Sequence, residues 1–325
     1  MTGIEAASGC AAPTESFVLP ARTTHRNPLM QPNADVPHDA NVPPESSERS
    51  TVRAALSASG LEAIDAAVLL GHVVRRGRAW LIAHADDPLS PEAAQEFDEF
   101  ARRRREGEPV AYLTGQREFW GLPLAVSPAV LIPRPETELV VEVALRRLGA
   151  MAGGGRVLDL GTGSGAIALA IGHDCPSASV LATDASRDAL AVARSNAERL
   201  GVANVNFVCS DWYSAVPSAW RGAAFDLIAS NPPYIAGGDP HLAQGDLRFE
   251  PASALTPGGD GLGALRTIVE GARNHLVAGG TLVVEHGFDQ SEAVQRLFAA
   301  SGFVDVVAIS DLAGIPRVVA GQAPA

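Results

Sequence analysis

The chain has 325 residues, 46% of them hydrophobic, which is enough for one large domain and a smaller one. No apolar run approaches the roughly 20 residues of a membrane span, so the sequence argues against a membrane protein and favours a cytoplasmic one. The three cysteines include no C-x-x-C pair, which argues against a disulfide framework and a zinc site, and we expect no metal. A formal charge of −12 argues against a broad electrostatic contact with nucleic acid, and we expect neither nucleic acid nor membrane as a direct partner.

The first part of the chain, residues 1–50, has the composition of a disordered extension. It contains seven prolines, many Ser, Thr, Asn and Ala residues, and no helical or strand periodicity. Such a segment buries too little apolar surface to offset the entropy lost on ordering, so we predict that it is disordered. The same composition is compatible with a translation start at Met30 or later.

Residues 51–115 have the pattern of a small helical domain. A second helix of this region begins with Ser90 as its N-cap and Pro91 at its first position. The run Arg102–Arg105 before Gly107 favours the C-terminus of that helix, because cations there stabilise the helix dipole; contact with a nucleic-acid-bound partner is the alternative. An earlier helix has apolar residues at three- and four-residue steps, which predicts one buried stripe: Leu61, Ile64, Val68, Leu69 and Val73.

Residues 116–138 predict a β-hairpin that links two domains. Short apolar pieces around Phe119–Pro123 and Val130–Ile132 are separated by turn formers. Arg134 and Glu136 follow on a proline-bounded loop before the next helix. Two interpretations of this pair stay open, a position facing a cleft and an ordinary helix start.

From Arg156 onward, strands and helices alternate, which predicts an α/β domain over residues 139–325. A buried strand over 157–160 leads into a glycine-rich turn and a helix that begins near Ala166. Asp184 closes the next strand, where a carboxylate can accept both ribose hydroxyls of an adenosine cofactor. The predicted cofactor turn consists of Gly161, Thr162, Gly163, Ser164 and Gly165.

The next two strands also end in residues that suit a ligand site. The strand over 205–208 is followed by Trp212, which can stack on adenine or simply pack in the core. The strand over 225–229 is followed by Ser230 and then by Asn231, Pro232, Pro233 and Tyr234.

The two prolines stiffen this last loop and remove backbone donors, so it offers acceptors with few competing N–H groups. The Asn231 side-chain oxygen and the Pro232 carbonyl can take both hydrogens of a planar NH2 group while the Tyr234 ring packs on its flat face. This arrangement suits methylation of an amide or an exocyclic amino nitrogen. A structural proline-rich turn is the alternative.

Taken together, these motifs resemble the release factor glutamine methyltransferases, the PrmC/HemK family. The resemblance covers about residues 51–320, and only the first 50 residues depart from it. The stretches that carry it are Gly107-Glu-Pro-Val-Ala-Tyr112, Arg117-Glu-Phe-Trp-Gly121, Leu131-Ile-Pro-Arg-Pro-Glu-Thr-Glu138, Leu158-Asp-Leu-Gly-Thr-Gly-Ser-Gly-Ala-Ile167, Asn231-Pro-Pro-Tyr234, Asp239-Pro-His-Leu242 and Arg248-Phe-Glu-Pro251.

The resemblance implies a class I methyltransferase with a Rossmann-like seven-stranded sheet, its last strand antiparallel, behind an N-terminal helical domain and a hairpin linker. It further implies S-adenosylmethionine on Gly161–Gly165, with Asp184 on the ribose, Trp212 against adenine and Asn231 near the methionine end. Asn231–Tyr234 would bind the substrate, which is the glutamine of the Gly-Gly-Gln motif in bacterial peptide chain release factors 1 and 2. The helical domain would help dock that partner, and we take a monomer as the working expectation.

Asn231, Pro232 and Tyr234 are therefore the predicted catalytic residues, and no general base is evident. Four other functions remain compatible with parts of the pattern. They are an adenine-N6 methyltransferase, a methyltransferase acting on a ribosomal-protein glutamine, an NAD-dependent oxidoreductase using Gly161, Gly163 and Ala166, and a cofactor-binding protein without catalysis.

Overall fold

The computed structural model describes residues 50–151, 153–217, 220 and 225–325. The prediction of disorder for residues 1–50 therefore lies almost entirely outside the described residues. The predicted boundaries at 51–115, 116–138 and 139–325 stay predictions, because the described part of the chain falls within one compact unit, Glu48–Ala325.

The N-terminal region is helical, and the predicted buried stripe of its second helix is confirmed in part. Leu69 is fully buried, and Leu61 and Val73 pack against the same core cluster. Ile64 and Val68 are 68% and 46% exposed, so their predicted burial was wrong, and Ala66 and Leu70 are buried as well. The Ser90 cap is present, since its hydroxyl accepts a hydrogen bond from the Ala93 amide at 3.1 Å. The helices are α1 (Val52–Ala58), α2 (Ala63–Val74), α3 (Arg78–Ala83), α4 (Pro91–Arg105) and α5 (Val110–Thr114).

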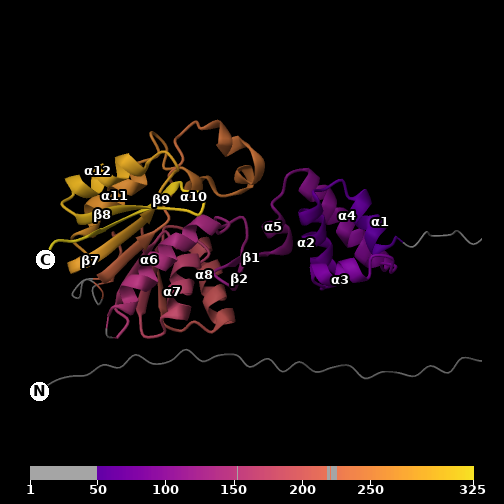
Figure 1. Cartoon of the computed structure of the whole chain (residues 1–325), viewed down its shortest axis with the longest axis horizontal. Coiled ribbons are helices and arrows are strands. Elements are labelled where there is room, and N and C mark those ends of the chain that lie inside the picture. Colours follow the sequence, from indigo (N-terminus) through magenta and orange to yellow (C-terminus); the bar gives the residue numbers. More distant parts are fainter. Residues whose placement is uncertain (1–49, 152, 218–219, 221–224) are drawn as a thin grey trace, which may run out of the picture. The chain divides into compact units, whose positions relative to one another are not determined.

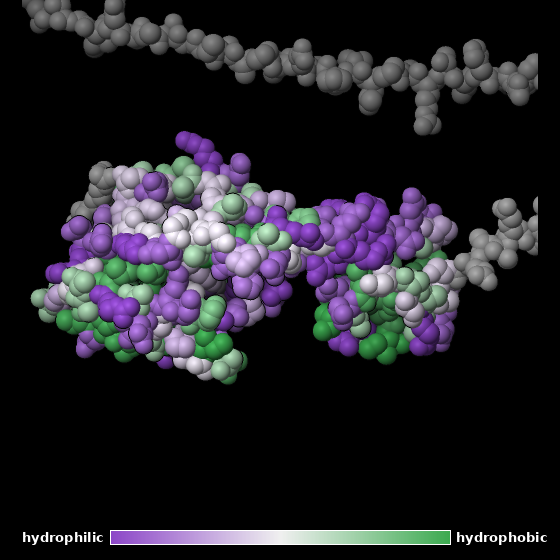
Figure 2. Space-filling view, turned by 90° about the horizontal axis from the view of Figure 1, so that it is seen from above, coloured by the Kyte–Doolittle hydropathy of each residue, from purple (hydrophilic) through white to green (hydrophobic). Residues whose placement is uncertain are grey.

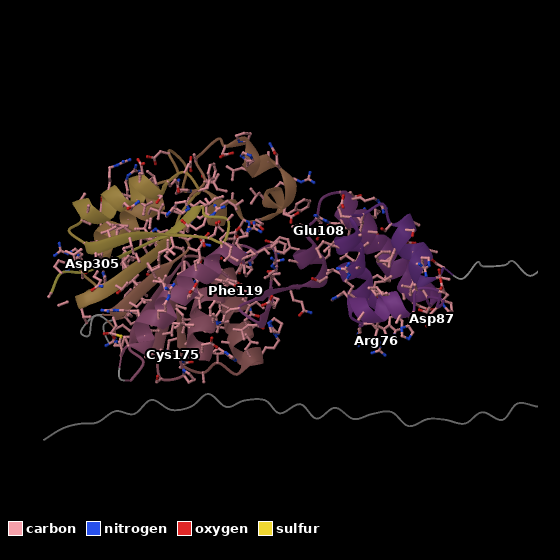
Figure 3. All side chains as sticks on the ribbon, in the orientation of Figure 1. Arg76, Asp87, Glu108, Phe119, Cys175 and Asp305 are labelled. Atoms are coloured by element: carbon pink, nitrogen blue, oxygen red, sulfur yellow. The ribbon has the colours of Figure 1, made fainter. Side chains whose placement is uncertain are left out.

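A hairpin follows, formed by β1 (Gln116–Phe119) and β2 (Leu122–Ala125). Its two turn residues, Trp120 and Gly121, have φ values of 55° and 72°, the left-handed geometry that matches the twist of a tight hairpin. Phe119, labelled in Figure 3, is 1% exposed and packs in the core cluster that also contains residues of α6 (Glu138–Gly149) and α7 (Ala166–Asp174). The predicted apolar piece Val130–Ile132 forms no strand and packs against the start of α8 (Arg187–Leu200).

The main sheet has seven strands in the order β5-β4-β3-β6-β7-β9-β8. The last strand, β9, is antiparallel to both of its neighbours, and the other pairs are parallel, so the predicted class I methyltransferase fold is confirmed. The strands are β3 (Arg156–Leu160), β4 (Ser179–Asp184), β5 (Val205–Cys209), β6 (Phe225–Ser230), β7 (Leu276–Glu285), β8 (Val304–Ser310) and β9 (Pro316–Gln322).

Helices cover both faces of this sheet (Figure 1). One face packs against α6 (Glu138–Gly149), α7 (Ala166–Asp174) and α8 (Arg187–Leu200), and the other against α11 (Gly263–Ala272) and α12 (Ser291–Ala300). Alternate residues of the central strands enter the two apolar cores, as expected for strands buried on both faces.

Short elements join these layers near the carboxyl ends of the strands. They are η1 (Pro135–Thr137), η2 (Pro240–Ala243), η3 (Gly245–Phe249) and α10 (Ala252–Leu255). The chain order reverses between β3 and β6, so the loops after these two strands leave the same edge of the sheet next to each other. Ligands of open α/β sheets bind at such a point.

The described residues contain no candidate membrane span and no candidate metal site. None of their helices is both long enough and apolar enough to cross a membrane. None of their His, Cys, Asp and Glu side chains gather in a group of three or more that could hold a metal ion.

Candidate active site

A cavity of about 410 Å³ lies at the carboxyl ends of β3, β4, β5 and β6. It brings together most of the predicted site residues, whereas Gly165, Pro232 and Tyr234 are not part of its lining. The predicted residues in the lining are Gly161, Thr162, Gly163, Ser164, Asp184, Trp212, Asn231 and Pro233.

The glycine-rich turn after β3 leaves room for a ligand beside its backbone. The amides of Gly161 and Thr162 both donate to the Thr183 carbonyl at 2.9 Å, which fixes the turn against β4. Gly163 has a φ of 57°, and a Cβ built there would meet no atom within 4 Å, so open space lies next to it. Gly165 has a φ of 88°, and a Cβ there would lie 2.8 Å from Leu169 Cδ1, so packing against α7 requires glycine.

Asp184 ends β4 and faces this turn. Its Oδ2 accepts from the Gly163 amide at 2.9 Å, and its Oδ1 accepts from the Ser186 amide at 2.8 Å. Burial raises the pKa of this carboxyl, while the two backbone donors oppose that shift. Because each carboxylate oxygen has a further lone pair, Asp184 can still accept from two hydroxyl groups of a ligand.

Trp212 fits both interpretations that the sequence left open. It lines the cavity, and its ring comes within 3.6 Å of a Cβ built on Gly161, so it covers the start of the glycine turn. It also packs against the apolar core cluster that includes α11. Its φ of 45° is unusual for a large side chain, and the Ser210 hydroxyl supports that backbone by donating to the Trp212 carbonyl at 2.8 Å.

Asn231 follows β6 with a defined amide orientation. Its Nδ2 donates to Thr137 Oγ1 at 2.9 Å. Within the described part of the chain, no hydrogen bond reaches Asn231 Oδ1 or the Pro232 carbonyl oxygen. The loop therefore has two acceptors without a partner among the described residues, next to the cavity that Asn231 lines, and their contact with a substrate stays a prediction.

The hydroxyl of Tyr234 binds a buried carboxylate. The hydroxyl donates to Glu285 Oε1 at 3.0 Å, and the ring packs against the core cluster of β6, β7 and α11. The predicted contact of this ring with the flat face of a substrate stays a prediction.

Thr137 and Glu285 are two residues that the sequence analysis did not single out. The Thr137 hydroxyl donates to Glu285 Oε2 at 2.6 Å, and Glu285 is 1% exposed at the end of β7. Burial raises the pKa of Glu285 to about 7, although hydrogen bonds from Thr137 and Tyr234 oppose the shift. Glu285 could have been predicted from the sequence, because it is an acidic residue at the end of an apolar strand, which is the pattern that identified Asp184.

Arg134 and Glu136 had two open interpretations, and the structure gives Arg134 a partner. Arg134 Nη2 contacts both Glu250 oxygens at 2.7 and 2.8 Å, and the Glu250 side chain is 0% exposed. The residues after Glu250, including Pro251 and Ser253, line the cavity. Arg134 therefore fastens one wall of the cavity, and the contact joins the Arg134-Pro-Glu and Arg248-Phe-Glu motifs.

Asn196 is a further residue that the sequence analysis missed. It lies 0% exposed on α8, where Oδ1 accepts from the Ala125 amide at 2.7 Å. Its Nδ2 donates to the carbonyls of Ala125 at 3.0 Å and Ser164 at 2.9 Å. This side chain ties the hairpin to the glycine turn.

The strand order, the glycine turn followed by an acid-terminated strand, and the Asn-Pro-Pro-Tyr loop after β6 define a class I methyltransferase. The family model described as methyltransferase small domain matches residues 137–262, and the one described as PrmC N-terminal domain matches residues 49–115.

Relatives that match most of the chain show which methyltransferase family it belongs to. The release factor glutamine methyltransferase of Bordetella pertussis is 53% identical over 266 residues, which cover 82% of this chain and 97% of that protein. The enzyme of the same name from Escherichia coli strain K12 is 47% identical over 267 residues, or 82% and 94% of the two chains. The chain belongs to the release factor glutamine methyltransferase family, which confirms the resemblance and makes it a protein-(glutamine-N5) methyltransferase.

Among solved structures, the release-factor-specific protein-(glutamine-N5) methyltransferase of Alicyclobacillus acidocaldarius is 34% identical, with a TM-score of 0.40. The match covers 62% of this chain and 100% of that one.

Proposed function

We propose that this enzyme methylates the side-chain nitrogen of the glutamine in the Gly-Gly-Gln motif of bacterial peptide chain release factors 1 and 2, using S-adenosylmethionine. The observation that supports the proposal is the pair of acceptors, Asn231 Oδ1 and the Pro232 carbonyl, that receive no hydrogen bond from the described residues, next to the cavity that Asn231 lines. A primary carboxamide has two N–H hydrogens, one for each acceptor.

The cavity residues fit the proposed cofactor. A volume of about 410 Å³ lies in the range of small-molecule sites. Gly163 leaves open space beside the turn, Asp184 retains acceptors for the ribose hydroxyls, and Trp212 offers a ring for the adenine. When bound, S-adenosylmethionine supplies an electrophilic methyl group.

The loop after β6 prepares the substrate nitrogen. An amide nitrogen is a poor nucleophile because its lone pair is delocalised into the carbonyl group. Two hydrogen bonds from its hydrogens to Asn231 and Pro232 would increase its electron density and fix its direction of approach, so positioning supplies most of the catalysis. After methylation one proton leaves to water, because the methylated amide cation is strongly acidic.

The helical region offers a surface for a protein partner. Ile64 and Val68 are exposed on α2 and line a second cavity of about 480 Å³ together with Gly71 and Thr114. Figure 2 shows apolar surface on this region beside strongly polar surface. Exposed apolar surface of this kind marks protein–protein contacts. A release factor docked here in the cytoplasm, by one enzyme monomer and with no direct contact to nucleic acid, is the partner that we propose.

The test is incubation of purified release factor 1 or 2 with the enzyme and labelled cofactor, followed by mass spectrometry of the Gly-Gly-Gln peptide. We expect one added methyl group on the glutamine. Asn231→Ala should lower turnover on the order of 100-fold and leave cofactor binding measurable by titration calorimetry. Asn274→Ala, at an exposed position far along the chain, is the matched control.

Two outcomes would contradict the proposal. Near-normal turnover of Asn231→Ala would remove its catalytic role. Label appearing on DNA, RNA or a ribosomal protein instead of the release factor would identify a different substrate for the same acceptors.

A further inference from the structure

Four side chains form one hydrogen-bonded chain behind the cavity. Asn231 donates to Thr137 at 2.9 Å, Thr137 donates to Glu285 at 2.6 Å, and Tyr234 donates to the other oxygen of Glu285 at 3.0 Å. The four come from three separate segments, namely the loop after β6, the short element η1 and the end of β7.

The donors and acceptors of this chain fit together in one way when Glu285 is ionised. A carboxylate only accepts hydrogen bonds, so the hydroxyls of Thr137 and Tyr234 must both donate to it. A hydroxyl has a single proton, and Thr137 donates that proton to Glu285. Thr137 can therefore only accept from Asn231, which must present its NH2 group inward and its Oδ1 toward the cavity.

Burial protects this arrangement from water. Thr137 is 4% exposed and Glu285 is 1% exposed, so solvent does not supply an alternative partner to either. The charged groups that face Glu285 are Glu136 from η1 and Arg317 from β9, besides the phenol of Tyr234.

We propose that Thr137 and ionised Glu285 are positioning residues that hold the Asn231 amide with its oxygen toward the substrate. The inference rests on the proposed function, because the Asn231 oxygen matters only if the substrate group is an NH2 donor. A reversed amide would face the substrate NH2 with a second NH2, and two donors form no hydrogen bond.

Protonation of Glu285 relaxes the constraint. A protonated carboxyl can donate to Thr137, which then can donate to Asn231 Oδ1 and stabilise the reversed amide. Because burial raises the pKa of Glu285 to about 7, the active ionised form is lost as the pH falls through that value. We expect kcat/KM to rise with pH through about 7 in the unmodified enzyme.

The experiment compares four variants in kcat, KM, cofactor affinity and the side-chain NH2 signals of Asn231 in 1H–15N NMR spectra. Thr137→Val removes the acceptor, and we expect about tenfold lower kcat/KM and displaced Asn231 signals. Thr137→Ser keeps the hydroxyl and should restore both. Glu285→Gln allows Thr137 to donate or to accept, so it should lower kcat/KM and abolish the pH dependence near 7.

The fourth variant, Thr281→Val, is the matched control on β7. Thr281 is 6% exposed, and its hydroxyl has no hydrogen-bond partner among the described residues, so we expect unchanged activity and unchanged Asn231 signals. Unchanged Asn231 signals in both Thr137→Val and Glu285→Gln would overturn the inference, as would full activity of Thr137→Val.

The experiments distinguish a failure of the proposed function from a failure of the inference about Thr137 and Glu285. If the enzyme does not methylate release factors at all, the proposed function fails, and the NMR signals still decide whether Thr137 and Glu285 set the amide orientation. If Thr137→Val does not fold, the NMR spectrum and pH profile of Glu285→Gln test the inference instead. Asn231 signals and a pH profile identical to those of the unmodified enzyme would then overturn it.

Discussion

Removal of the Arg134 guanidinium should destabilise one wall of the active-site cavity. Arg134 is the ion-pair partner of Glu250, whose side chain is 0% exposed, with both carboxylate oxygens within 2.8 Å of Nη2. Replacement of Arg134 by Leu leaves this carboxylate buried without its counter-charge. Breaking a buried pair in this way costs about 3 kcal/mol or more of unfolding free energy.

The cost depends on pH in a defined direction. Burial already raises the pKa of Glu250 in the intact protein, because desolvation outweighs the attraction of Arg134. Loss of Arg134 raises the pKa of Glu250 further, so Glu250 binds its proton at a higher pH in the folded variant than in the unfolded chain. The free energy of unfolding of Arg134→Leu therefore decreases as the pH rises and Glu250 ionises. We expect its difference from the unmodified protein to be larger at pH 8 than at pH 5.

Urea denaturation followed by tryptophan fluorescence at both pH values measures this effect. The double variant Arg134→Leu/Glu250→Gln should recover most of the loss, since no buried charge remains. Arg296→Leu, which breaks an ion pair with side chains 72% and 88% exposed, is the control and should change little. A pH-independent loss below about 1 kcal/mol, or a double variant no better than Arg134→Leu, would refute the reasoning.

Two further predictions concern the glycine turn. Asn196→Ala removes four side-chain hydrogen bonds, including the buried one to the Ser164 carbonyl, and should cost about 3 kcal/mol in urea denaturation. A loss within about 0.5 kcal/mol, roughly the scatter of surface substitutions, would contradict this prediction. Gly163 and Gly165 both have positive φ, so alanine at either position should cost about 1 kcal/mol of stability. Gly163→Ala should in addition weaken cofactor binding by about tenfold or more, because its Cβ would enter the open space beside the turn. Gly165→Ala should lose about 2 kcal/mol of stability, because its Cβ would also lie 2.8 Å from Leu169 Cδ1. Titration calorimetry together with denaturation separates the two, and normal cofactor affinity in Gly163→Ala would show that the turn does not contact the cofactor.

The strands and their terminal residues were predictable because they depend on local patterns. A buried parallel strand reads as a short apolar run, and the turn that follows it needs glycine or proline at fixed positions. The runs before Gly161 and Asn231 are β3 and β6, and the class I fold follows from their alternation with helices. The hairpin was predictable for the same reason, since Gly121 suits the left-handed turn.

The burial of α2 was only partly predictable from periodicity. The predicted residues have helical spacing, and Leu61, Leu69 and Val73 do pack in the core cluster of this region. Ile64 and Val68 are exposed, whereas Ala66 and Leu70 are buried. The position of the neighbouring helices decides which side of the helix is buried, and the spacing of apolar residues alone does not contain that information.

The orientation of Asn231 lies outside what the Asn-Pro-Pro-Tyr motif can specify by itself. Its amide donates to Thr137, 94 residues earlier in the sequence, and Thr137 donates to Glu285, which lies 148 residues after Thr137. The fold makes this connection because β6 and β7 are neighbours and end at the same edge. A free amide at the end of a strand has no preferred direction, so on the proposal above Asn231 Oδ1 faces the substrate only where an ionised acid and a single-proton hydroxyl lie behind it, whereas the Pro232 carbonyl is an acceptor in either case. A chain with this motif but without that pair would keep the backbone acceptor and lack a fixed side-chain acceptor for an NH2 group, and the Thr137 and Glu285 variants separate these two cases within one protein.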